Sequence, residues 1–310
     1  MNDMNDMKNL PKVDIVIVTW NDYYDLFECL ESLKESTYEN YGVIVVNAEP
    51  NEQELGRLIR EYGSSIEILL TSSNLGAPGN RNLGIEYALM DGADYILLLD
   101  SDTILESNSL SAMVEVASSD SRVGAVQPSV FLYESPEGLD YAELPYDSYW
   151  PQLIPEFNRV LRILQRKRDS PLSVRSISSI SAGASMVKRQ TFCAVGLQDP
   201  LYFYGCEDLD FSYRAIRAGF KLLLAPHARI YHKRKTVSKA RGVYGAFHAY
   251  YLARGRAILA RKTLAPLPLA VYYVILFTLI IPHGFVINLK SKTAAAYLTG
   301  VRDGLIVRIK

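Results

Sequence analysis

The stretch Tyr95-Ile96-Leu97-Leu98-Leu99-Asp100-Ser101-Asp102 decides the fold, because it joins an apolar run directly to two carboxylates. Four large apolar residues in a row, Ile96 to Leu99, are typical of a strand that is buried on both faces of a parallel sheet. Open α/β sheets bind their ligands at the carboxyl ends of such strands, which is where Asp100 and Asp102 stand. These carboxylates could bind a hard divalent cation, although an isolated Asp-x-Asp is more often a solvated turn.

Strand and helix patterns alternate through the first half of the chain. Apolar, β-branched runs predict strands at 13–19, 43–46, 66–70 and 96–99. Helical spacing of apolar residues follows the first strand and the second. The Gly/Pro/Asn stretch 74–82 is predicted to be a loop that leads into a helix around Ile85. This alternation predicts βαβ units and an α/β, mostly parallel sheet flanked by helices.

The second half is less regular. Residues 132–176 contain five prolines and a basic run, and we interpret them as a long irregular insertion with one short helix. Small residues at 181–187 lead into a strand, and Cys206-Glu207-Asp208-Leu209-Asp210 opens a helix. Residues 222–224 and 229–232 are predicted to be two short final strands.

The charge of the chain is divided unequally. Residues 1–150 carry 7 Lys/Arg and 27 Asp/Glu, whereas residues 151–310 carry 26 Lys/Arg and 7 Asp/Glu. The second half is therefore expected to face something anionic, such as phospholipid, a sugar diphosphate or nucleic acid. Three scattered cysteines without metal-ligand spacing, and a polar N-terminus over residues 1–11, favour a cytoplasmic protein with a flexible start.

An uncharged segment lies near the C-terminus. Residues 264–289 contain no Lys, Arg, Asp or Glu, and this length could cross a bilayer. Prolines interrupt the segment and basic residues flank both ends, which disfavours a single crossing and favours an interfacial helix or a re-entrant hairpin. A buried helix or a homodimer contact is the alternative. We therefore expect residues 236–310 to form a basic and apolar helical tail that associates with the cytoplasmic face of the membrane.

Taken together, the motifs resemble the family 2 glycosyltransferases with the GT-A fold. The resemblance covers residues 12–235, and it is similar in detail to the subgroup of rhamnosyl- and galactofuranosyl-transferases. It rests on the following segments: Ile15-Val16-Ile17-Val18-Thr19-Trp20-Asn21, Asn74-Leu75-Gly76, Asn80-Arg81-Asn82-Leu83-Gly84-Ile85, Leu97-Leu98-Leu99-Asp100-Ser101-Asp102, Ser181-Ala182-Gly183-Ala184, Gly205-Cys206-Glu207-Asp208-Leu209-Asp210 and Ile230-Tyr231-His232.

The resemblance implies a role for each matching residue. Asp208 would be the general base, with Glu207 as the fallback. The metal ligands for Mg²⁺ or Mn²⁺ would be Asp100 and Asp102, completed by His232, with Asp100 also near the ribose. The remaining matches would line the nucleotide-sugar pocket: Thr19, Trp20, Asn21, Asn47, Asn74, Gly76 and Arg81. Trp20 would either stack on the nucleotide or pack against the protein.

One departure from the family pattern concerns the base of the nucleotide. The chain reads Val45-Val46-Asn47-Ala48-Glu49, with Asn47 where the family usually carries an Asp, so the nucleotide is left unnamed. The Gln-x-x-Arg-Trp signature of processive synthases is absent, which favours the addition of a single sugar.

These observations predict an inverting, metal-dependent glycosyltransferase. It would move one sugar from a nucleotide diphosphate sugar to a hydroxyl of a saccharide or lipid-linked acceptor, with insertion 132–176 near the acceptor. The alternatives are a polyprenyl-phosphate glycosyltransferase, a sugar nucleotidyltransferase and a non-catalytic membrane-binding scaffold. The turn after the first strand has neither the glycine nor the basic residue that a triphosphate requires, which counts against the nucleotidyltransferase. No nucleic-acid-binding motif accompanies the basic half, so nucleic acid is not an expected partner.

Overall fold

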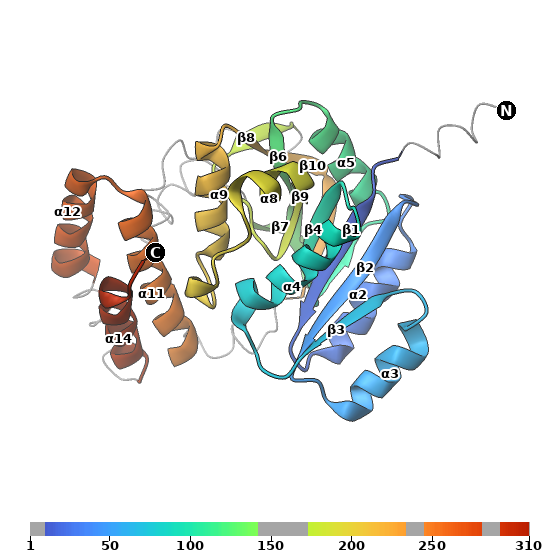
Figure 1. The fold of residues 1–310 in the computed structure, drawn as a ribbon, viewed down its shortest axis with the longest axis horizontal. Helices are drawn as coiled ribbons and strands as arrows, with labels where there is room; N and C mark the ends of the chain where they lie inside the picture. The colour runs from blue at the N-terminus through green and yellow to red at the C-terminus, as the bar shows by residue number, and fades with distance from the viewer. Residues whose placement is uncertain (1–9, 142–172, 234–244, 281–291, 310) are drawn as a thin grey trace.

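The computed structural model describes residues 10–141, 173–233, 245–280 and 292–309 (Figure 1). Its centre is a ten-stranded sheet with helices on both faces, and further helices lie beyond one end of it. The strands are β1 (Val13–Thr19), β2 (Tyr41–Ala48), β3 (Glu67–Thr71), β4 (Tyr95–Asp100), β5 (Thr103–Leu105), β6 (Val123–Leu132), β7 (Ser135–Tyr141), β8 (Arg175–Ile177), β9 (Ala184–Lys188) and β10 (Lys221–His232). The helices are α2 (Tyr23–Lys34), α3 (Glu52–Tyr62), α4 (Gly76–Met90), α5 (Ser109–Ser118), α8 (Arg189–Val195), η2 (Pro200–Tyr202), α9 (Glu207–Arg217), α11 (Ala246–Thr263), α12 (Pro266–Ile275), the π-helical turn η3 (Leu276–Ile280) and α14 (Lys292–Ile306).

The sheet has a parallel part and a mixed part. Its order is β3-β2-β1-β4-β9-β6-β10-β5, with β7 beside β6 and β8 beside β10. The strands β3, β2, β1 and β4 are parallel, which confirms the βαβ prediction for the first half. β9 instead enters antiparallel between β4 and β6, so the whole sheet is mixed. The apolar pattern of residues 184–187 shows which residues are buried and carries no signal for strand direction.

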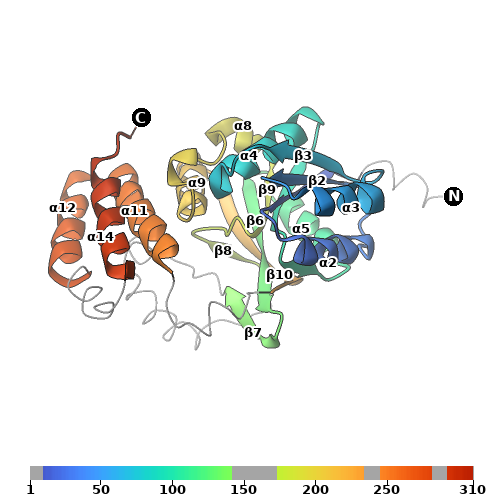
Figure 2. The same cartoon turned by 90° about the horizontal axis from the view of Figure 1, so that it is seen from below.

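Two apolar cores cover the two faces of the sheet. Helices α2, α3 and α5 pack on one face through Leu26, Leu58 and Met113, and α4, α8 and α9 pack on the other. Strand side chains alternate between these cores, which is why Ile15 and Ile17 lie in one and Val16 in the other. The view in Figure 2 separates the two helical layers. A strand covered on both faces needs the continuous apolar run that the sequence shows.

Three predicted boundaries were wrong. Residues 76–82, predicted as loop, form the first turns of α4, because Phe203 O accepts a hydrogen bond from Ala77 N at 2.8 Å and holds the helix start. The two predicted final strands are one strand, β10, which keeps its pairing with β6 across a register shift between Ala225 and Arg229. The ends of the predicted irregular insertion form β7 and β8. The short helix predicted inside the insertion lies outside the described residues.

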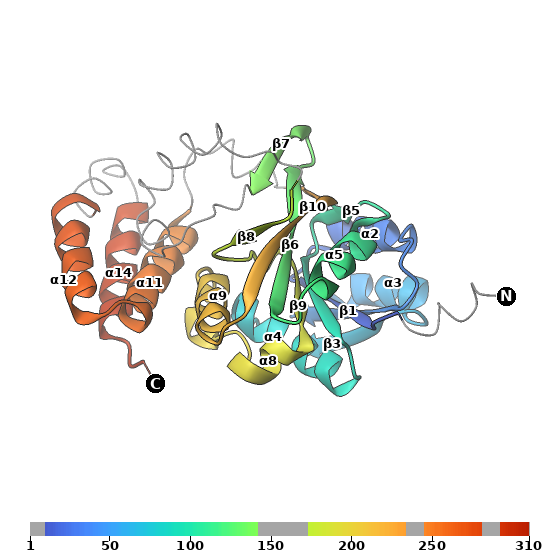
Figure 3. The ribbon, with the colours of Figure 1, turned by 90° about the horizontal axis from the view of Figure 1, so that it is seen from above.

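The C-terminal helices form a third core. α11, α12 and α14 bury Ile258, Leu259, Tyr272 and Val301 together with Tyr202 and Cys206, which precede α9. A Cβ on Gly300 would come within 2.2 Å of Tyr250 O, so the absent side chain allows α11 and α14 to pack closely. Figure 3 shows these helices on the α9 side, at the end opposite the N-terminus. Among the described helices, none is both long and apolar enough to cross a membrane.

Candidate active site

Three parallel strands bring polar side chains to one edge of the sheet. Thr19 and Asn47 are register partners at the ends of β1 and β2, and Asp100 ends β4 beside Val18. Asn47 is fully buried and its Nδ2 donates to Tyr23 Oη at 2.7 Å. Within the described part of the chain, Thr19 Oγ1 and Asn47 Oδ1 are buried without a hydrogen-bond partner. Buried acceptors of this kind are costly without a hydrogen-bond donor, and a ligand at this edge could supply one.

The turn after β1 points an aromatic ring outward. Trp20 is 60% exposed, and its Nε1 donates to Glu49 Oε2 at 2.8 Å. Trp20 therefore lies at the surface beside Glu49, and its predicted stacking on the nucleotide stays a prediction. Asn21 follows in the left-handed region with φ 56°, a conformation that concentrates at functional turns.

Arg81 connects the two acidic motifs of the sequence. It lies on α4 and is 5% exposed; its Nη2 is 2.7 Å from Asp100 Oδ1 and its Nη1 is 3.0 Å from Glu207 Oε1. Burial alone would lower the pKa of Arg81, but the two carboxylates outweigh it and raise that pKa. The guanidinium is thus held between protein carboxylates. Arg81 Nε is buried without a partner among the described residues, and the predicted contact of Arg81 with the nucleotide stays a prediction.

Asn74 and Gly76 shape the turn into α4. Asn74 Oδ1 accepts from Gly76 N at 2.9 Å and from Asn80 Nδ2 at 3.1 Å. Gly76 has φ 77°, and a Cβ there would meet Phe203 O at 2.3 Å, so the position requires glycine. Both residues hold the start of the helix that carries Arg81. Their predicted contact with the nucleotide stays a prediction.

Asp100, Asp102 and His232 form a group that could hold a metal ion. One ligand atom from each lies within 4.8 Å of the others, and His232 Nε2 is 3.2 Å from Asp102 Oδ1. His232 ends β10 and pairs in register with Thr103 of β5, which brings it beside the acidic turn. Carboxylate oxygens suit Mg²⁺ and Mn²⁺, and an imidazole nitrogen is compatible with Mn²⁺. The donor set therefore fits the predicted ion.

Gly183 is a site residue whose role was missed at the sequence level, although its segment belongs to the motif set. Its carbonyl accepts from Asp100 N at 2.9 Å, and a Cβ there would lie 2.5 Å from Asp100 Oδ2. The absence of a side chain makes room for the carboxylate. The only signal in the sequence was the run of small residues Ser181-Ala182-Gly183-Ala184, which did not reveal what they approach.

Asp208 and Glu207 are neighbours in different environments. Glu207 is 5% exposed and paired with Arg81, whereas Asp208 keeps some contact with solvent. Desolvation by the surrounding protein, with a smaller contribution from the charge of Glu207, raises the pKa of Asp208 from 3.8 to about 7. Asp208 Oδ1 also accepts from Leu209 N at 2.8 Å. A carboxylate with this pKa is suited to take a proton near neutral pH.

The loop before α9 is strained and is anchored at both ends. Phe203, Gly205 and Cys206 all have positive φ, at 61°, 76° and 72°. Asp210, which is 1% exposed, anchors the first turn of the helix by accepting from Tyr202 Oη at 3.2 Å and from Lys262 Nζ at 2.5 Å. Left-handed non-glycine residues are costly and cluster at functional sites, and here they aim the helix start that carries Asp208.

The match to a family model decides the classification. The model described as "Glycosyl transferase family 2" matches residues 14–186, which is more than half of the chain. The chain belongs to glycosyl transferase family 2. It is therefore a glycosyltransferase, and the resemblance seen in the sequence is confirmed.

Curated relatives of this family 2 chain include two named as rhamnosyltransferases. The chain is 24% identical over 239 residues to the N-acetylglucosaminyl-diphospho-decaprenol L-rhamnosyltransferase of Mycobacterium tuberculosis, covering 70% of this chain and 75% of the relative. It is 25% identical over 289 residues to the dTDP-rhamnosyl transferase RfbF of Shigella flexneri, covering 91% of this chain and 90% of the relative. The alignment with the Shigella relative extends over nearly the whole of both chains.

Solved structures support the GT-A fold of this family 2 chain. A mannosyltransferase, PcManGT from Pyrobaculum calidifontis in complex with GDP-Man and Mn²⁺, matches with a TM-score of 0.56 and 15% identity over 97% of this chain and 88% of that one. GalNAc-T7 with UDP, GalNAc and Mn²⁺ matches with a TM-score of 0.63 and 18% identity, over 82% of this chain and 48% of that longer one. At these identities the similarity shows the fold alone.

Proposed function

We propose that this glycosyltransferase moves a single deoxyhexose, rhamnose, from a nucleotide diphosphate donor to a hydroxyl of a saccharide acceptor, with inversion. The observation that carries the proposal is the bridge through Arg81. It joins Asp100, in the group that could hold a metal, to Glu207, the neighbour of Asp208. This bridge supports a site in which the leaving diphosphate and the base would lie beside one another. The names of two relatives support rhamnose as the sugar.

The donor would lie along the edge formed by β1, β2 and β4. Thr19 Oγ1 and Asn47 Oδ1, both buried and without a partner among the described residues, would accept hydrogen bonds from the nucleotide, and Trp20 offers a ring for stacking. Asp100, Asp102 and His232 would hold Mg²⁺ or Mn²⁺. The ion, when bound, would neutralise the negative charge on the departing diphosphate.

Asp208 would act as the general base. A sugar hydroxyl is a weak nucleophile, and a carboxylate within hydrogen-bond reach can take its proton as it attacks the anomeric carbon of the donor. The bond to the diphosphate oxygen breaks as the new glycosidic bond forms, and the proton stays on Asp208. Glu207 is the weaker candidate, because its buried carboxylate is already paired with Arg81. One base opposite the leaving group corresponds to a single displacement with inversion.

Aromatic side chains next to the base would form the acceptor side. Tyr204 stands four positions before Asp208, and its ring lies 5.5 Å from that of Phe247 and 5.2 Å from that of His248 on α11. Phe247 is 50% exposed, so part of this cluster is accessible to a ligand. The apolar faces of sugar rings can pack against such aromatic surfaces. The predicted covering of the acceptor by residues 132–176 falls largely outside the described residues.

The acceptor would be a lipid-linked saccharide. The name of the Mycobacterium relative contains a polyprenyl diphosphate carrier, and the basic composition of residues 151–310 suits an anionic acceptor. Action at the cytoplasmic face of the membrane stays a prediction of the sequence.

Turnover of a panel of nucleotide sugars tests this function. We expect nucleoside diphosphate release from dTDP-rhamnose in the presence of Mn²⁺, none with EDTA, and a rate that rises when a polyprenyl diphosphate saccharide is added in detergent. Asp208→Asn is the matched control, because it keeps the size of the side chain and removes the base. Failure of every donor to bind in calorimetry with Mn²⁺ would overturn the proposal, and turnover of another donor alone would overturn the choice of sugar.

A further inference from the structure

Asp210 is a buried carboxylate in the first turn of α9 that the proposed reaction does not use. It is 1% exposed, and its Oδ2 accepts from Arg214 Nε at 2.8 Å. Its Oδ1 accepts from Tyr202 Oη at 3.2 Å and lies 2.5 Å from Lys262 Nζ. A buried charge is costly unless opposite charges and hydrogen bonds compensate it, and here two cations and a hydroxyl do so. Asp210 is therefore held firmly in place.

Lys262 joins the C-terminal helices to this carboxylate. It stands in the last turn of α11, and its Nζ is also 3.0 Å from Asp199 Oδ2. Asp199 in turn accepts from Leu201 N at 2.9 Å, at the start of η2. The Lys262 side chain is 19% exposed, and its Nζ lies 5.4 Å from the centre of the Tyr202 ring. Salt screens such partly buried pairs much less than exposed ones, so one ammonium group holds both η2 and α9 to α11.

The strained residues lie between the two elements that Lys262 holds. Phe203, Gly205 and Cys206 have positive φ, and a left-handed backbone at the two non-glycine residues persists only where the surroundings enforce it. Tyr202 precedes this segment and Asp210 follows it, and Lys262 Nζ is close to both. α11 lies beside α9 in Figures 1 and 3 and contacts both η2 and α9. Contacts at both ends of the segment hold it in its strained conformation.

The same segment contacts both halves of the candidate site. Phe203 O accepts from Ala77 N at 2.8 Å and holds the start of α4, the helix that carries Arg81. At its other end the segment leads directly into Glu207 and Asp208. Relaxation of the strained backbone would therefore displace the candidate base and the start of α4 together. A displacement of about 1 Å can lower turnover by about 10²-fold.

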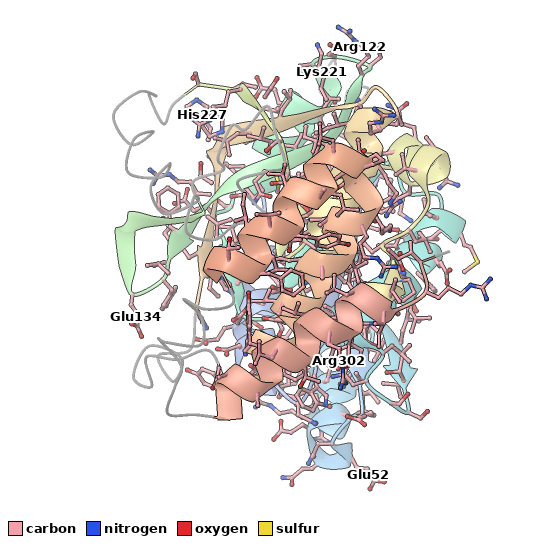
Figure 4. All side chains as sticks on the ribbon, turned by 90° about the vertical axis from the view of Figure 1, so that its left-hand side faces the viewer. Glu52, Arg122, Glu134, Lys221, His227 and Arg302 are labelled. Carbon is pink, nitrogen blue, oxygen red and sulfur yellow. The ribbon has the colours of Figure 1, made fainter. Side chains whose placement is uncertain are left out.

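We propose that Lys262 is a positioning residue for the base Asp208, because its ion pair with Asp210 makes the C-terminal helices hold residues 203–206 in their strained conformation. The inference rests on the proposed function, which takes Asp208 as the base. It gives the C-terminal helices a part in catalysis that acts through the fold. Figure 4 looks onto these helices with the sheet behind them.

Steady-state kinetics of Lys262→Met in the full chain test this role. Methionine keeps most of the apolar stem of lysine and removes the charge. We expect kcat to fall by about 10²-fold, while the donor KM stays unchanged because Thr19 and Asn47 lie at the ends of other strands. The rise of kcat/KM with pH should move below about 7, because a relaxed segment admits water to Asp208, whose pKa is raised by desolvation. Lys262→Arg keeps the charge and should restore most of the turnover.

Lys221→Met is the matched control. Lys221 Nζ is 2.6 Å from Asp120 Oδ2, and this ion pair lies on β10 away from α9, where Figure 4 labels Lys221. The control should keep the wild-type kcat and pH profile, even if its melting temperature falls. Tyr202→Phe removes one hydroxyl from the same carboxylate and should lower kcat by a smaller factor than Lys262→Met. It tests the inference even if Lys262→Met does not fold.

Hydrogen exchange without substrate separates this inference from the proposed function. Amides of residues 203–210 should exchange faster in Lys262→Met, or in Tyr202→Phe, than in the wild type and Lys221→Met. Absence of donor turnover in the wild type would be a failure of the proposed function. Unchanged exchange in Lys262→Met would overturn the positioning role whatever the donor, and so would an unchanged kcat when the wild type is active. An equal loss of kcat in Lys221→Met would also overturn it.

Discussion

Replacing Asp208 by Asn is expected to abolish activity and to stabilise the protein. Loss of a general base typically costs about 10²–10⁴-fold in turnover. The same side chain is held in surroundings that disfavour its charge, since burial and Glu207 raise its pKa from 3.8 to about 7. Asparagine keeps an oxygen that can accept from Leu209 N and removes the charge that is disfavoured. Activity and stability should therefore change in opposite directions.

The size and the pH dependence of the increase in the free energy of unfolding follow from the raised pKa of Asp208. Between about pH 4 and pH 7 the folded wild type holds a proton on Asp208 that the unfolded chain has released, so the free energy of unfolding falls as pH rises through this window. A pKa that rises from 3.8 to about 7 corresponds to at most about 4 kcal/mol. Because Asp208 retains some solvent contact, we expect about 2 kcal/mol. The variant should match the wild type near pH 4 and exceed it at pH 8.

Urea unfolding at pH 5, 6, 7 and 8, followed by circular dichroism, measures this difference. Glu207→Gln is the contrasting control: it removes a partner of the buried Arg81 and should lower the free energy of unfolding by about 1–3 kcal/mol. If Asp208→Asn were no more stable than the wild type at pH 8, or if the difference did not change with pH, the reasoning would be refuted. The surroundings would then not disfavour the charged form of Asp208.

Three further outcomes are expected. The kcat/KM of the wild type should rise with pH through about 7, because Asp208 must be deprotonated to act as the base. In Glu207→Gln this rise should occur at lower pH, since the variant removes a charge that raises the Asp208 pKa. A rise at the same pH in both proteins would contradict the effect of Glu207 on Asp208. Asp102→Asn, measured by Mn²⁺ titration of turnover after EDTA treatment, should need more than about tenfold more metal, whereas unchanged metal dependence would exclude it as a ligand. Gly183→Ala would place a Cβ 2.5 Å from Asp100 Oδ2 and should reduce turnover by about 10²-fold with little loss in thermal melting; normal activity would show that Asp100 can shift freely.

Local patterns along the chain predicted the elements that the site is built on. The apolar run from Ile96 to Leu99 is buried as β4 and ends at Asp100, and the acidic stretch from Glu207 opens α9. These predictions succeed because burial on two faces and helix initiation each depend on residues close in sequence. The prediction for the start of α4 was wrong for the opposite reason. Gly76, Pro78 and Asn80 are local signals for a loop, but the helix start is held by a distant group, Phe203 O, which accepts from Ala77 N.

The sequence by itself determined which groups are available: two carboxylates after a buried strand, a Glu–Asp pair at a helix start, and an uncharged segment near the C-terminus. Only the tertiary structure decided how they are used. It sets His232 Nε2 3.2 Å from Asp102 Oδ1 across 130 positions and pairs Arg81 with Glu207 across 126. It also exposes Leu267 and Val274 of the uncharged segment. Local sequence governs backbone preference, whereas the pKa of Asp208 and the pairing of Arg81 arise from charges and burial that distant segments supply.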